Sequence, residues 1–418
     1  MLHRTMAIAA LCAALVFAMS LGGVASAQSD ADLAARAIHD RVITIDTHVD
    51  IPATFSTDGY DMMKPGPRGQ QVHLPGMIDG GLDAPFLIVF VGQGERNTAG
   101  YARALSDAFV KFSAIHKLTA QLYPEKIELA FTAADVRRIH AGGKKVALIG
   151  IENGYPMGKD LRLLDHFYDY GARYFGLLHN GHNDLGDSAQ PDKRRNEPVA
   201  EWGGLSPLGK QVVKRLNELG IMVDVSHASD QSTLDMLAVS AAPVIASHSG
   251  VKGQSDHARN LSDAALQGIK RSGGVVQIVA FDSYLRAVPP EKAAALAALG
   301  KDMGFKEPAD VLKMTPAQAE IYDAKMAEID KKWPKATVKD LVDHVDYAVK
   351  QIGVDHVGLA SDFNGGGGIG GWNNAGEALN VTLELVSRGY SEPQIAKIWG
   401  GNLLRVMERV EAVSTNRK

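Results

Sequence analysis

Five side chains of the types that bind metal ions stand at the carboxyl ends of four strand-like runs. Each run is apolar and rich in β-branched residues, and it becomes polar only where it ends. The five side chains are His48, Asp50, Glu152, His227 and His248. Polar groups at the carboxyl ends of parallel strands form the active sites of α/β barrels. The sequence therefore predicts one shared site made of imidazoles and carboxylates.

Two of these candidates, His48 and Asp50, lie two positions apart in IDTHVD. On a strand this spacing directs both side chains to the same face. Taken alone the pattern is weak, because an ordinary buried histidine would look the same. Glu152 ends the run VALIGIE, and an unpaired buried carboxylate there would be costly. A salt bridge is the alternative, for which Arg259 is the nearest candidate partner.

A carboxylate can bridge two cations, so the pattern favours two metals that share Glu152. His48 and Asp50 would bind one, and His227 and His248 the other. The only cysteine, Cys12, lies in the N-terminal apolar run, which leaves nitrogen and oxygen ligands. That donor set favours two Zn²⁺ per chain, with Mn²⁺ or Co²⁺ as alternatives. A water between two such ions becomes hydroxide near neutral pH and attacks an amide carbonyl.

Three further residues complete a hydrolytic site. His179, in LLHN, is suited to donate to a developing oxyanion. Asp362, in LASDFNG, is suited to carry a proton from the water to the leaving nitrogen. Arg259, in HARN, is suited to bind a substrate carboxylate. Singly they would read as a core histidine, a helix cap and a surface arginine. The loop after His179 carries further residues that are either caps or ligands: His182, Asp184 and Asp187.

The elements that must position these residues alternate between strand and helix. The expected strands are 43–49, 86–92, 146–152, 174–179, 221–227, 243–248, 275–281 and 356–362. The expected helices are 101–123, 161–171, 206–220, 230–240, 261–273 and 338–353. Eight alternations predict a (β/α)8 TIM-type barrel rather than a doubly wound open sheet. Insertions follow strands 1 and 7, at 51–85 and 286–337, and the second is helical. We expect one domain over 28–418.

The N-terminus resembles a secretory signal over residues 1–27. Arg4 precedes an apolar run, and Ala25-Ser26-Ala27 is a small-x-small cleavage pattern, so the mature chain should start at Gln28. A membrane anchor is the alternative. We therefore expect a periplasmic or secreted protein. With 45% hydrophobic residues and a net charge of −4 among 418 residues, no nucleic-acid partner is expected.

The motifs as a set resemble the membrane (renal-type) dipeptidase family of zinc metallopeptidases, a branch of the amidohydrolase-like barrels. They are IDTHVDIP (45–52), IENG (151–154), LLHN (177–180), VDVSHAS (223–229), VIASHSG (244–250), ARN (258–260) and HVGLASDFNG (356–365). The resemblance implies a binuclear zinc site with the five ligands above and Glu152 bridging. It also implies His179 for intermediate stabilisation, Arg259 for substrate contact and Asp362 for proton handling.

The chain departs from the family pattern at a few positions. Thr47 and Val49 flank the first histidine where the family often has Gly and Asn. The segment AFDSYLRAV also differs, so Tyr284 is only a weak substrate-contact candidate. The 286–337 insertion exceeds that of mammalian members. Because the chain ends polar, no stable membrane anchor is expected after signal cleavage. The family also implies a homodimer.

Three functions compete on these residues. The leading hypothesis is an exported zinc dipeptidase that cleaves the amide bond of small dipeptides. The second is hydrolysis of a non-peptide amide or N-acyl amino acid at the same metals. The third is a non-hydrolytic maturation or binding protein that keeps the fold, which loss of a ligand would favour. All five ligand positions are filled, so the sequence favours an enzyme.

Overall fold

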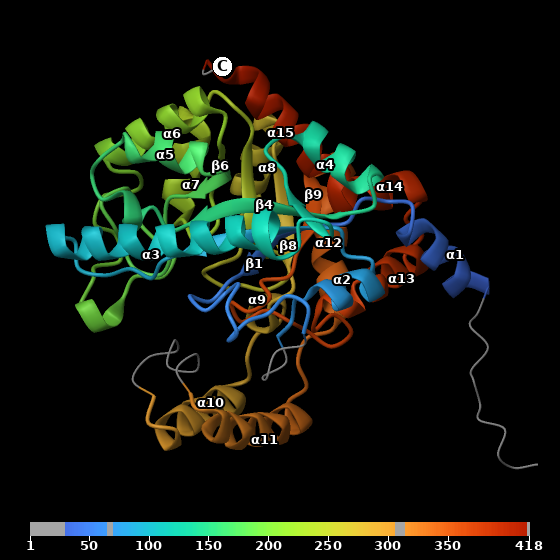
Figure 1. The fold of residues 1–418 in the computed structure, drawn as a ribbon. Helices are drawn as coiled ribbons and strands as arrows, with labels where there is room; N and C mark the ends of the chain where they lie inside the picture. The colour runs from blue at the N-terminus through green and yellow to red at the C-terminus, as the bar shows by residue number, and fades with distance from the viewer. Residues whose placement is uncertain (1–29, 65–69, 306–313, 416–418) are drawn as a thin grey trace, which may run out of the picture.

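The computed structural model describes residues 30–64, 70–305 and 314–415. At its centre, eight parallel strands form a barrel surrounded by helices (Figure 1). The barrel strands are β1 (Ile45–Asp50), β2 (Ala84–Phe90), β4 (Lys145–Glu152), β5 (Ala172–Gly176), β6 (Met222–Asp224), β7 (Val244–Ser249), β8 (Val275–Val279) and β9 (Val357–Ala360). Each predicted strand corresponds to one of them, which confirms the (β/α)8 prediction.

The sheet closes where its first and last strands meet. Neighbouring strands follow the order β1-β2-β4-β5-β6-β7-β8-β9. An isolated parallel bridge then joins Val49 to Phe363. Asp362 N donates to His48 O at 3.0 Å, and Asp50 N donates to Phe363 O at 2.9 Å. The closing seam therefore lies at the carboxyl ends of β1 and β9, beside predicted site residues.

Two details of the strand prediction are wrong. A short strand, β3 (Ile127–Leu129), pairs with β4 outside the barrel ring and was not predicted. Three residues are too few to show a strand period. In addition, β5 ends at Gly176 and β6 at Asp224, so His179 and His227 lie beyond their strands. The apolar runs continue past the last ladder hydrogen bonds because the following turns are buried too.

The six predicted helices are present with shifted ends. They are α3 (Thr98–Lys117), α5 (Leu163–Asp169), α6 (Pro207–Leu219), α7 (Asp230–Val239), α8 (Asp263–Ser272) and α12 (Val338–Ile352). Local chemistry sets their limits, as α6 shows: Ser206 accepts from Gly209 N at the start, and Gly220 ends the helix at φ 84°. The other helices beside the barrel are α1 (Asp30–His39), α4 (Ala133–Ala141), α13 (Leu379–Ser387), α14 (Glu392–Ala396) and α15 (Asn402–Val413).

Both predicted insertions leave the carboxyl end of the barrel. Residues 51–85 contain α2 (Leu74–Gly80) before β2 begins. After β8 come α9 (Asp282–Leu285), α10 (Pro290–Asp302) and α11 (Pro316–Lys332), with 306–313 outside the described residues. Figure 1 shows α10 and α11 side by side at the end of the molecule opposite α15 and α4. The second insertion is helical, as predicted.

The described helices can be compared with the length and hydropathy of a membrane-spanning helix. None of them combines the length and the apolar character that a bilayer span needs. The expected signal (1–27), its Cys12 and the cleavage point before Gln28 lie outside the described residues.

Candidate metal centre

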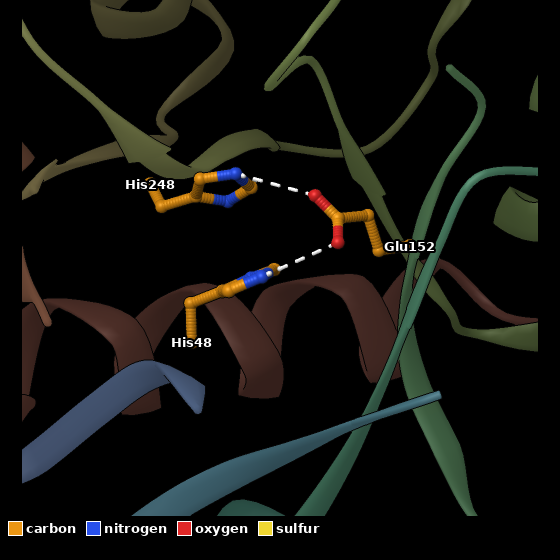
Figure 2. Close-up of side chains that lie close together, drawn as sticks. All are labelled: His48, Glu152 and His248. Carbon is orange, nitrogen blue, oxygen red and sulfur yellow. Dashed lines mark ion pairs between the residues drawn. The ribbon is translucent and has the colours of Figure 1, made fainter. Parts of the chain in front are cut away.

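The five predicted ligands meet around the carboxylate of Glu152. Its Oε1 lies 2.9 Å from His227 Nε2 and 3.4 Å from His248 Nε2. Its Oε2 lies 3.5 Å from His48 Nε2, which is also 3.5 Å from Asp50 Oδ2. The two carboxylate oxygens thus face different histidines. Figure 2 shows His48 and His248 approaching opposite oxygens of Glu152.

The far nitrogen of His48 is fixed from the barrel interior. Its Nδ1 lies 2.9 Å from the Tyr174 hydroxyl, which itself donates to Thr47 O at 3.1 Å. With its one proton so used, the hydroxyl accepts from Nδ1–H, so Nε2 is the nitrogen that offers a lone pair when the ring is neutral. Gly150 makes room for the tyrosine, because a Cβ there would lie 2.2 Å from the ring. Thr47 fits the interior by donating to Ser247 O at 2.6 Å.

The other two histidines are fixed in the same way. His248 Nδ1 lies 2.8 Å from Ser247 Oγ, whose own proton goes to Asp224 Oδ2 at 2.6 Å. His227 Nδ1 lies 3.2 Å from Asn180 Oδ1, which can only accept. Both imidazoles therefore present unprotonated Nε2 atoms to the site. Such outer partners orient metal-binding histidines and set their tautomer.

This arrangement fits divalent cations. When the three rings are neutral, their Nε2 lone pairs point at the Glu152 oxygens, an arrangement that is repulsive until a cation lies between them. His48 Nε2 is buried and has no hydrogen-bond partner among the described residues. His227 Nε2 and His248 Nε2 are 3.1 Å apart, near the ~3.3 Å that separates two nitrogens on one tetrahedral zinc ion with Zn–N of ~2.0–2.1 Å. The donor set of imidazole and carboxylate suits zinc and related metals.

The charges at the site are strongly coupled. Burial raises the pKa of Glu152, but the surrounding imidazoles, His48 foremost, hold that pKa well below its usual range. Burial lowers the pKa of His48, yet Glu152 and Asp50 raise it well above its usual value. Burial and the neighbouring Asp50 and Glu152 carboxylates raise the pKa of Asp362 well above its usual range. The concentrated carboxylates thus favour cations at their centre.

Two of the predicted residues sit on strained backbone. His227 has φ 67° and Asp362 has φ 57°, in the left-handed region that non-glycine residues rarely adopt. Gly365 packs directly against the site, since a Cβ there would lie 2.2 Å from Asp50 Oδ2 and 2.4 Å from Asp362 Oδ1. The turn after β9 is therefore held tightly around the carboxylates.

The remaining predicted residues border the ligands. His179 Nε2 lies 3.9 Å from Glu152 Oε1, and its side chain is 21% exposed. Asp362 Oδ1 lies 4.0 Å from His48 Nε2. His179 can join Glu152 and His227 in a group of potential ligands, and Asp362 can join His48 and Asp50 in another. Their position therefore allows either ligation or contact with a substrate.

Arg259 lies beside the histidines and is buried. One guanidinium nitrogen donates to His248 O at 3.2 Å, while Nε has no hydrogen-bond partner among the described residues. The guanidinium lies 5.3 Å from the centre of the Tyr284 ring, on α9. That ring stacks in turn on Phe281 at 4.2 Å. The structure thus brings Tyr284 to the site, against Arg259, rather than leaving it apart.

The three residues of the loop after β5 that the sequence left as either caps or ligands stabilise that loop. Asp187 accepts from Glu201 N at 2.8 Å, and His182 Nε2 contacts Pro198 O at 2.9 Å. Asp184 accepts from Tyr101 and pairs with Lys159.

The sequence reasoning missed the partners that orient the histidines, and only the adjacency in Ser247-His248 could have signalled one. Those partners are Tyr174, Asn180, Ser247 and Asp224.

Fold and site together define an α/β-barrel metallohydrolase. The chain also matches the sequence model described as "Membrane dipeptidase (Peptidase family M19)" over residues 33–418. It therefore belongs to the membrane dipeptidase family and is an enzyme of that metal-dependent dipeptidase class. The predicted resemblance is confirmed.

Individual relatives agree with the family. Dipeptidase tcpJ of Claviceps purpurea is 31% identical over 352 residues, which are 83% of this chain and 71% of that protein. The probable dipeptidase PvdM from Pseudomonas aeruginosa superposes with a TM-score of 0.81 at 36% identity, covering 92% of this chain and 99% of its own. A Rhodobacter sphaeroides metallopeptidase liganded with a phosphinate mimic of L-Ala-D-Ala shares the fold, with a TM-score of 0.67 at 21% identity and coverage of 88% and 99%.

Proposed function

We propose that this enzyme is a binuclear zinc dipeptidase that hydrolyses the amide bond of small dipeptides. The observation that supports it most is the placement of Glu152, whose Oε1 faces His227 and His248 while its Oε2 faces His48, the neighbour of Asp50. Mn²⁺ or Co²⁺ would suit the same donors. When bound, such a metal pair activates water as a nucleophile and polarises the amide carbonyl.

His48 and Asp50 would hold one ion, and His227 and His248 the other, with Glu152 shared. This division follows the carboxylate, since Oε2 faces His48 and Oε1 faces the two later histidines. The Nδ1 partners keep all three imidazoles in the orientation that the ions need.

The residues around the ligands would position and convert the substrate. Arg259 binds the free carboxylate of the dipeptide through guanidinium N–H groups, one of which is buried and has no partner among the residues that the structure describes. His179 donates from its ring to the carbonyl oxygen as negative charge develops there. Asp362 accepts a proton from the attacking water and returns it to the leaving nitrogen. The Tyr284 ring packs against the guanidinium of Arg259 and holds it in place.

Elemental analysis of the purified enzyme beside a panel of dipeptides tests this proposal. We expect two zinc ions per chain and hydrolysis of dipeptides that have a free C-terminal carboxylate. Amides of the same dipeptides should be poor substrates because they cannot pair with Arg259. Hydrolysis of N-acyl amino acids or lactams in preference to every dipeptide would favour the second hypothesis instead.

We further propose that the enzyme is exported and that its mature form starts at Gln28. Support comes from the basic residue, apolar run and Ala-Ser-Ala pattern of residues 1–27. Mass spectrometry of the protein recovered from its native compartment would test this. An intact Met1 would overturn it.

A further inference from the structure

A lysine from outside the predicted site reaches its edge. Lys111 lies on α3, a helix that packs against β2, and is half-buried. Its Nζ lies 5.6 Å from the centre of the Phe90 ring, at the carboxyl end of β2. Phe90 in turn packs on His179, with ring centres 4.5 Å apart, and pairs with Glu152 in the sheet. Lys111 therefore borders the mouth of the metal centre.

The charge of this lysine is poorly balanced by the protein. Within the described parts of the chain, Lys111 forms no hydrogen bond and no ion pair, and its one direct polar contact is the aromatic ring. Burial lowers its pKa, and only the more distant Asp50, Glu152 and Asp107 oppose that effect. A half-buried ammonium that forms no ion pair with any described residue is costly, so its placement calls for an anionic group.

The position of Lys111 relative to Arg259 indicates where that anionic group belongs. Lys111 stands over β2, and Arg259 follows β7, four places away in the ring of eight strands. The two cations therefore lie on opposite sides of the metal centre. If Arg259 holds the C-terminal carboxylate, the N-terminal residue of a dipeptide extends toward Phe90 and Lys111.

We infer that Lys111 is a specificity-determining residue that selects dipeptides whose N-terminal residue carries a carboxylate. The inference rests on the proposed dipeptidase function and deepens it by naming a substrate class. The ammonium would form a charge-assisted hydrogen bond with the side-chain carboxylate of a residue such as glutamate, beside the Phe90 ring. A neutral side chain of equal size would lack that bond.

The dipeptides L-Glu-L-Ala and L-Gln-L-Ala test the inference, because they differ in one charge at almost constant shape. We expect kcat/KM of the wild-type enzyme to favour Glu-Ala by about tenfold or more, the scale of one charged hydrogen bond. Lys111→Met should remove the preference while changing Gln-Ala hydrolysis by less than about threefold. Lys111→Arg should retain it.

Arg103→Met is the matched control, because it removes one cation from an exposed position on the same helix. It should leave the Glu-Ala to Gln-Ala ratio unchanged. Zinc content is measured for every variant, since the charges of Asp50 and Glu152 act on Lys111. An unchanged ratio in Lys111→Met, or loss of zinc with equal loss of both activities, would overturn the inference. Failure of the wild type to cleave any dipeptide would overturn the proposed function as well.

Discussion

The two halves of the proposed metal centre are built in different ways. In the first half, His48 and Asp50 belong to β1, whose backbone pairs with β2 on one side and with the closing seam on the other. In the second half, His248 belongs to β7, but His227 lies in a turn beyond β6 with φ 67°. One half is thus held by the sheet on both sides, and the other depends partly on a loop.

The histidine partners differ in the same sense. Tyr174, which contacts His48 at 2.9 Å, is fully buried in the barrel. Asn180, which contacts His227 at 3.2 Å, lies in the loop after β5 and is exposed. The comparison indicates that the His48 half is preorganised by the core, whereas the His227 half can adjust. Glu152 is the residue proposed to link the two, because its carboxylate faces histidines of both halves.

The largest effect is expected from removing that link. Glu152→Ala should lose both metals and lower kcat/KM by about 10³-fold or more, because several kcal/mol of transition-state stabilisation depend on the ions. Elemental analysis after dialysis measures the first effect. Glu320→Ala, at an exposed position on α11, is the control. A Glu152→Ala protein that kept one metal would show that the halves bind independently.

Asp362 tests whether the His48 half contains a third ligand. Its Oδ1 lies 4.0 Å from His48 Nε2, close enough for either role. If it carries protons, Asp362→Asn should keep metal content near the wild type and lower kcat by about 10²-fold. KM should change much less, because the residue acts on the transition state. Asp58→Asn, on an exposed loop, is the control. Loss of metal would make Asp362 a ligand, and near-normal kcat would move the proton role to His179.

The smallest effects should come from the histidine partners, and they compare the halves directly. Tyr174→Phe should lower the affinity for one metal by about tenfold or more, as is usual for such outer partners. Asn180→Ala should lower the affinity for the other metal by less, because the contact of Asn180 with His227 is longer and lies in a loop. Chelator competition, followed by metal content, measures both. Equal effects, or a larger effect of Asn180→Ala, would contradict the comparison.

The sequence predicted the barrel because each strand is a continuous apolar run between helices. It also predicted that Glu152 and the four candidate ligands around it share one place, since each ends such a run. It could not predict that His227 lies in a left-handed turn, because no local pattern separates a strand end from a buried turn. Tyr174 and Lys111 were missed for another reason. Their relation to the site depends on which strands and helices become neighbours, and neither periodicity nor composition records that.

The closing seam has a consequence for how the chain folds. Asn364 donates to Asp50 O at 3.0 Å across 314 positions of sequence, and Ser361 N donates to Asp46 Oδ1 across 315. Contacts between such distant partners carry a large loop-closure entropy and form slowly. During synthesis, the edge of β1 that faces the seam stays unpaired until β9 has left the ribosome. The barrel is therefore sealed late, and truncation before Val357, where β9 begins, should leave an aggregation-prone open sheet although all five predicted ligands have already been made.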